Sequence, residues 1–168
     1  MKERGLAKKA TEKNSAAVFP SAGSLKVAII VSQWHQQITD SLFDSALAAL
    51  LKNGCRRGNI SRYDVPGSFE ILFAAKEAAQ TNVDAIICFG CLVKGDTPHF
   101  DLISTAVTNG IANLNLTYNI PFIFGVLTTH TLKQAQDRVN GKVENKGEDC
   151  AVAMLQMVEL KKKFKTSV

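Results

Sequence analysis

The 168-residue sequence lacks the long apolar runs that mark membrane proteins and secretory signals. It contains no stretch of 18 apolar residues, which argues against a membrane-spanning helix. Its first residues carry charge but no apolar segment, unlike a secretory signal. We therefore expect a cytoplasmic protein. An organelle stroma or matrix stays open as an alternative, because the N-terminus is rich in Lys, Ala and Ser.

The sequence also has little excess charge outside its two ends. Of the formal net charge of +5, residues 1–25 contribute +3 and residues 161–168 contribute +4, which leaves about −2 for residues 26–160. A nucleic-acid-binding domain would concentrate its basic residues on the folded part of the chain. We therefore expect no nucleic-acid partner.

Cysteine is scarce, with four residues, of which Cys88 and Cys91 have the spacing of redox and zinc motifs. Cys88 lies inside an apolar run, where a free thiol behaves as a small hydrophobic group. No second such pair and no histidine pair completes a zinc site. We expect free thiols, a reducing compartment, and no metal or other cofactor.

The apolar pattern alternates between strand-like and helix-like segments. Strands are predicted at residues 25–31, 59–65, 84–89 and 121–127, and helices at 36–53, 69–80, 100–116, 131–139 and 147–164. Continuously apolar strands separated by helices predict an α/β fold, a flavodoxin-like three-layer sandwich with a four-stranded parallel sheet and helices on both faces. Residues 1–23 lack periodicity and are interpreted as a flexible arm that precedes a single domain at 24–168.

The most informative segment is residues 90–99 (GCLVKGDTPH), which we expect to form a strand-to-helix turn. Such a turn offers free backbone N–H groups and the positive end of a helix to an anion. His99 adds a group that transfers protons near neutral pH. The segment therefore predicts chemistry on a phosphorylated small molecule.

The other strand ends place further functional side chains at the same edge of the sheet, where open parallel sheets bind ligands. These side chains are Trp34, His35, Ser68, Phe69, Glu70 and His130. Trp34, the only tryptophan, is interpreted as a stacking platform for a flat ring, with a core position as the alternative. Phe69 is explained equally well as a helix cap packed on the core, and His35 and His130, taken singly, as surface residues.

A basic cluster lies between the last two predicted helices and contains Arg138, Lys142 and Lys146. It is explained either as a solvated charged loop or as a phosphate clamp, in which an arginine makes two parallel hydrogen bonds.

Together these segments resemble the lumazine synthase family of riboflavin biosynthesis. The matching segments are residues 65–70 (VPGSFE), 93–101 (VKGDTPHFD), 122–129 (FIFGVLTT), 134–138 (QAQDR) and 145–147 (NKG). The resemblance covers about residues 25–160 and implies the condensation of 5-amino-6-(D-ribitylamino)uracil with 3,4-dihydroxy-2-butanone 4-phosphate, which releases phosphate and water. It implies no metal or redox cofactor.

The resemblance also implies a role for each matching residue. Catalysis is implied for His99 and Arg138. Phosphate binding is implied for Gly95, Asp96, Thr97 and Arg138. Substrate binding is implied for Trp34, His35, Ser68, Phe69, Glu70, Cys91, Leu92, Val93, Phe124 and Lys146. Phe124 and Lys146 would come from an adjacent subunit, because the sites of this family lie between subunits.

Two residues depart from the family pattern. His35 stands where the family typically has an asparagine that contacts substrate, so contacts to the polyol chain are expected to differ. Asp96 places a carboxylate beside the expected phosphate site, and we expect this side chain to point away from the anion while its N–H faces it.

The resemblance further implies a homopentamer or a pentamer-based icosahedral capsid, with riboflavin synthase as a candidate partner. Two other functions stay open at this point. His35 motivates a catalytically weak lumazine- or flavin-binding or shell-forming relative. An FMN-carrying electron carrier is disfavoured, because the chain is not acidic and a histidine-bearing turn has no role there.

Overall fold

The computed structural model of the chain describes Phe19 and residues 22–166. The strands are β1 (Val27–Ser32), β2 (Ile60–Val65), β3 (Ala85–Val93) and β4 (Phe122–Thr129). The helices are α1 (Gln36–Lys52), α2 (Ile71–Ala79), α3 (His99–Thr117), α4 (Leu132–Val139) and α5 (Lys146–Thr166), with short 3-10 turns η3 (Ala22–Ser24) and η4 (Arg57–Asn59). None of the described helices is both long and apolar enough to cross a membrane.

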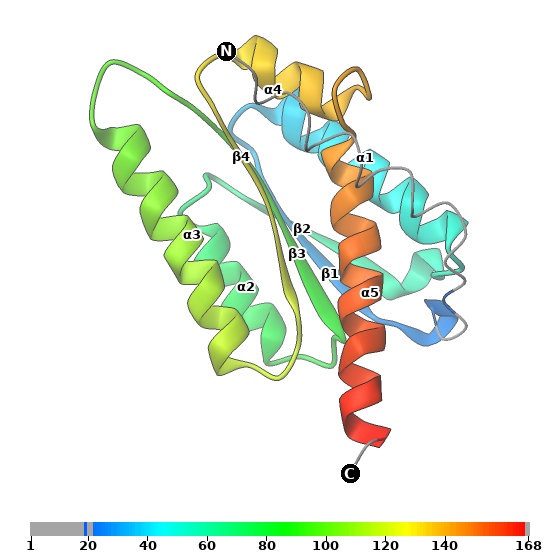
Figure 1. Ribbon diagram of the computed structural model, residues 1–168. Helices are drawn as coiled ribbons and strands as arrows, with labels where there is room; N and C mark the ends of the chain where they lie inside the picture. The colour runs from blue at the N-terminus through cyan, green and yellow to red at the C-terminus, as the bar shows by residue number, and fades with distance from the viewer. Residues whose placement is uncertain (1–18, 20–21, 167–168) are drawn as a thin grey trace, which may run out of the picture.

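The four strands form one parallel sheet in the order β2-β1-β3-β4. Helices α2 and α3 cover one face, and α1, α4 and α5 cover the other (Figure 1). Every residue of the central strand β1 is buried, whereas the edge strand β2 has exposed positions, as its more polar sequence indicates. The predicted three-layer α/β fold is confirmed.

The strand β3 is longer than predicted and corrects the extent of the expected turn. Residues 90–93 continue the strand and pair with residues 126–129 of β4. Gly90 was interpreted as the start of a turn, but it is a strand residue where another side chain approaches closely. A Cβ atom there would lie 2.7 Å from the Ser68 hydroxyl. The turn between β3 and α3 is therefore limited to residues 94–98.

Part of the predicted arm at residues 1–23 can be described. Ala22 is buried, and Phe19 packs against the cluster of core side chains to which α1 and α5 contribute. The rest of the arm lies outside the described residues, and its flexibility stays a prediction.

The contact between α1 and α5 depends on Gly147. A Cβ atom at this position would lie 2.3 Å from the Leu42 carbonyl oxygen. We expect Gly147→Ala to lower the free energy of unfolding by about 1–3 kcal/mol, although alanine is the better helix former. Chemical denaturation measures this change. Gly58→Ala is the matched control, because no heavy atom lies within 4 Å of its added Cβ. Equal stability of the two variants would contradict the close approach.

Candidate active site

A cavity of about 470 Å³ lies at the carboxyl ends of β1 and β3. Its lining residues are Trp34, His35, Gly67, Ser68, Phe69, Glu70, Cys91, Leu92, Val93, Gly95, Thr97, His99, Phe100 and Ile103. The predicted site residues from the first three strand ends therefore gather around one cavity, with the exception of Asp96. The volume is within the range of small-molecule sites.

Two aromatic side chains form an open wall of the cavity. Trp34 is 67% exposed and Phe69 is 51% exposed, so neither is a core residue. The Trp34 indole and the His35 imidazole contact each other edge-on, with ring centroids 6.2 Å apart. The exposed faces of such rings can stack on a flat heterocycle.

His35 adopts a strained backbone conformation at the start of α1. Its φ of 57° and ψ of 50° are left-handed, and among the described residues only glycines share a positive φ with it. Its carbonyl oxygen accepts hydrogen bonds from the N–H groups of Ile38 and Thr39, which start the helix. Histidine is one of the few non-glycine residues enriched in this conformation, but it still needs the surrounding structure to hold it there.

The floor of the cavity contains a buried hydroxyl group. Ser68 is 4% exposed, and its Oγ has no hydrogen-bond partner among the described residues. Gly90 of β3 leaves the space that this hydroxyl occupies. A buried polar group without a partner is available to a ligand hydroxyl or a water molecule.

The fold does not bring the Cys88 and Cys91 thiols together. The two residues lie three positions apart on β3 and pack in clusters on opposite faces of the sheet. Burial raises the pKa of the Cys91 thiol to about 11 and that of Cys88 to about 12. Both thiols are therefore protonated at neutral pH and are poor nucleophiles. All four cysteines carry free, buried thiols.

The turn after β3 presents a helix N-terminus at the mouth of the cavity. The Lys94 N–H bonds the Thr129 carbonyl at 2.9 Å, which anchors the turn to β4. His99 is the first residue of α3, and no side-chain cap is recorded for this helix within the described chain. Its first N–H groups are therefore open to an anion. The exposed Asp96 side chain does not line the cavity.

Three predicted site residues lie away from this cavity in the single chain: Phe124, Arg138 and Lys146. Phe124 is on the edge strand β4 and is 38% exposed, and Lys146 begins α5. The chain therefore brings together the cavity residues but leaves these three on other surfaces.

Arg138 is held in a defined place on α4. This helix starts with a capping box, in which the Thr131 hydroxyl accepts a hydrogen bond from the Gln134 N–H at 3.2 Å. The Arg138 Nε lies 3.1 Å from Glu144 Oε1, and its Nη1 donates to the Gln134 carbonyl. A guanidinium has five N–H donors, so Arg138 can bind an anion in addition to the Glu144 carboxylate. His130 lies at the same helix start, outside the cavity, where its backbone N–H bonds Gln134 Oε1.

The structure adds cavity residues that the sequence interpretation missed. Gly67, Phe100 and Ile103 also line the cavity. The helical spacing of His99 and Ile103, four positions apart, could have indicated that α3 presents Ile103 beside the histidine. Within the described residues, no group of three or more His, Cys, Asp or Glu side chains is arranged to hold a metal ion.

A parallel α/β sheet with such a cavity beyond its strand ends is typical of proteins that bind small molecules. The family model described as 6,7-dimethyl-8-ribityllumazine synthase matches residues 24–162. Similar proteins of that name occur in Parabacteroides distasonis (48% identical over 83% of this chain and 88% of the relative), Bacteroides fragilis (46%, over 80% and 95%) and Campylobacter jejuni subsp. doylei (43%, over 83% and 91%). The chain belongs to the 6,7-dimethyl-8-ribityllumazine synthase family, whose members are transferases of riboflavin biosynthesis.

Proposed function

We propose that the cavity condenses 5-amino-6-(D-ribitylamino)uracil with 3,4-dihydroxy-2-butanone 4-phosphate to form 6,7-dimethyl-8-ribityllumazine. The observation that carries this proposal is the position of His99. It lines a cavity with two exposed aromatic side chains and lies beside the exposed turn at residues 94–98, whose N–H groups would bind an anion. The family membership of the chain supports the same reaction.

The cavity offers each part of the two substrates a matching group. Trp34 and Phe69 would stack on the pyrimidine, and backbone groups of residues 91–93 would lie along its edge. Glu70 and the Ser68 hydroxyl would bond the ribityl hydroxyls, with His35 near the same chain. The N–H groups of residues 95–97 and the Thr97 hydroxyl would hold the phosphate.

The chemistry needs orientation and proton transfer. The pyrimidine amino group attacks the ketone carbonyl, and loss of water gives an imine. Inorganic phosphate then leaves, and the ribityl-bearing nitrogen closes the ring with loss of a second water. His99 would carry protons between the nitrogen and oxygen atoms that change, a contribution of about 10²–10⁴-fold in rate.

The remaining groups would come from an adjacent subunit. In that arrangement Arg138 faces the phosphate, while Phe124 and Lys146 close the cavity over the pyrimidine. Their distance from the cavity within one chain and the exposure of Phe124 support this part of the proposal. A homopentamer, alone or in an icosahedral capsid, and riboflavin synthase as a partner belong to the same proposal, since they come from the family resemblance alone. A cytoplasmic location is proposed as well.

The direct test mixes the purified protein with both substrates and follows lumazine absorbance and orthophosphate release. The proposal expects both products to form in equal amounts and faster than in the protein-free reaction. A rate equal to that of the protein-free mixture would contradict it. A second measurement locates the phosphate site: a bound anion within hydrogen-bond reach of the Asp96 carboxylate would contradict the expected orientation of that side chain.

A further inference from the structure

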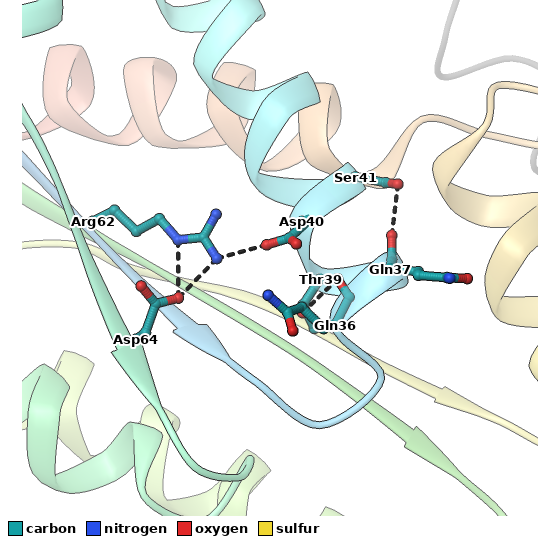
Figure 2. A network of polar contacts seen from close by, with 7 residues as sticks. All are labelled: Gln36, Gln37, Thr39, Asp40, Ser41, Arg62 and Asp64. Atoms are coloured by element: carbon teal, nitrogen blue, oxygen red, sulfur yellow. Dashed lines mark hydrogen bonds and ion pairs between the residues drawn. The ribbon is translucent and has the colours of Figure 1, made fainter.

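A charged network joins the start of α1 to the edge strand β2 (Figure 2). The Arg62 Nη2 lies 2.6 Å from Asp40 Oδ1 on α1. The Nε and Nη2 of the same guanidinium bond Asp64 Oδ1 at 2.9 and 2.7 Å. The guanidinium also lies over the Phe43 ring, 4.7 Å from its centroid. Arg62 is thus held by three side chains, two of them on α1.

The network adjoins, along the chain, the two segments that carry the aromatic side chains of the cavity. Asp40 is in the second turn of α1, whose first residue follows Trp34 and His35. Asp64 precedes Val65, whose carbonyl accepts a 2.8 Å hydrogen bond from the Gln33 N–H. Residues 66–70 follow and include Phe69 and Glu70, which line the cavity. The ion pairs therefore connect the segment that carries Trp34 to the strand that leads to Phe69.

Other polar contacts near the start of α1 stay within the helix. The Thr39 hydroxyl donates to the Gln36 carbonyl and the Ser41 hydroxyl to the Gln37 carbonyl, as Figure 2 shows. These bonds stabilise the first turns but do not fix their place against the sheet. A left-handed residue such as His35 persists only where its surroundings hold it. The bond between Arg62 and Asp40 is such a constraint from outside the helix.

We propose that Arg62 is a positioning residue, which acts through Asp40 to hold Trp34 and His35 in place for the aromatic substrate. This inference rests on the proposed function. The charged side chains of the network are 27–41% exposed, so their ion pairs contribute little to global stability. The effect is therefore expected in substrate binding rather than in folding.

The test compares Arg62→Met, Arg62→Lys, Asp40→Asn and Asp64→Asn in the full chain. Arg62→Met and Asp40→Asn should each raise the KM for the aminopyrimidine about three- to tenfold. In the double variant the KM should be little higher than in either single variant, because both changes remove the same bond. The KM for the butanone phosphate and kcat should change less than about twofold. Arg62→Lys should keep part of the substrate affinity that Arg62→Met loses. Asp64→Asn should raise the KM for the aminopyrimidine less than Asp40→Asn does, because the bond between Arg62 and Asp40 on α1 remains. Lys76→Met, which removes the ion pair with Glu77 on α2, is the matched control.

The single tryptophan supplies a second readout that needs no substrate. Fluorescence anisotropy decay of Trp34 should show larger local motion in Arg62→Met and Asp40→Asn than in the wild type and the Lys76→Met control. If both variants keep the wild-type anisotropy decay and KM, and at most their melting temperature falls, Arg62 has a structural role only and the positioning proposal is wrong. A wild type that fails to condense or bind the substrates would defeat the proposed function, while the anisotropy measurement still decides the positioning role.

Discussion

Replacing His99 by alanine is expected to lower kcat about a hundredfold, with little change in either KM. His99 is the first residue of α3 and lines the cavity, where the proposed reaction would form the imine and release phosphate. Its removal would take away the proton carrier but leave the aromatic wall and the phosphate turn intact. Steady-state kinetics, followed by lumazine absorbance, measures the loss.

The matched control for this variant is His130→Ala. His130 follows β4 but does not line the cavity, and its backbone N–H bonds Gln134 Oε1. Its side chain has no hydrogen bond to any of the described residues. Its replacement should leave kcat within about twofold of the wild type. The assignment of His99 would be wrong if both variants kept full activity, or if both lost the same fraction.

Replacing Arg138 by alanine is expected to lower kcat/KM for the butanone phosphate about ten- to hundredfold. Glu144 and the Gln134 carbonyl hold the guanidinium on two sides and leave its other N–H groups for a phosphate. Arg138→Lys should recover only part of the loss, because an ammonium group cannot make the two parallel bonds. The KM for the aminopyrimidine should stay unchanged, since stacking does not involve this side chain.

Lys133→Ala is the control on the same helix. The Lys133 side chain is 77% exposed, and its ammonium group pairs with Asp137 one turn away. Its loss therefore removes a charge from α4 without changing the contacts of Arg138 with Glu144 and Gln134. A similar loss in both variants would indicate a general electrostatic effect. An unchanged KM for the butanone phosphate in Arg138→Ala would remove the arginine from the phosphate site.

The fold could be predicted because its central strands are apolar without interruption and its helices show a clear period. The largest departure is β3, which was predicted to end at residue 89, before Gly90, but continues to Val93. A side chain at position 90 would clash with the Ser68 hydroxyl, which explains the glycine there. Ser68 follows a different strand, so this contact cannot be recognised from the sequence around Gly90. Strand length here is set by pairing with β4, a contact between distant residues.

The cavity could be predicted for a related reason. Parallel strands bring their carboxyl ends to one edge, so Trp34, Phe69, Glu70 and His99 were expected to meet before any contact was known. The backbone conformation of His35 and the Arg62–Asp40 bond were missed, because both depend on how α1 packs beside β2.

The central claim is that each active site joins the His99 cavity of one subunit to the Arg138 of the next. Co-expression of His99→Ala and Arg138→Ala chains tests it most directly. In a closed ring with random mixing, about one site in four receives both intact residues, so the mixture should recover about a quarter of wild-type activity. Each variant expressed alone should stay near its own low rate. Activity of the mixture at the average of the two variants, with ring assembly verified by mass, would contradict the shared site.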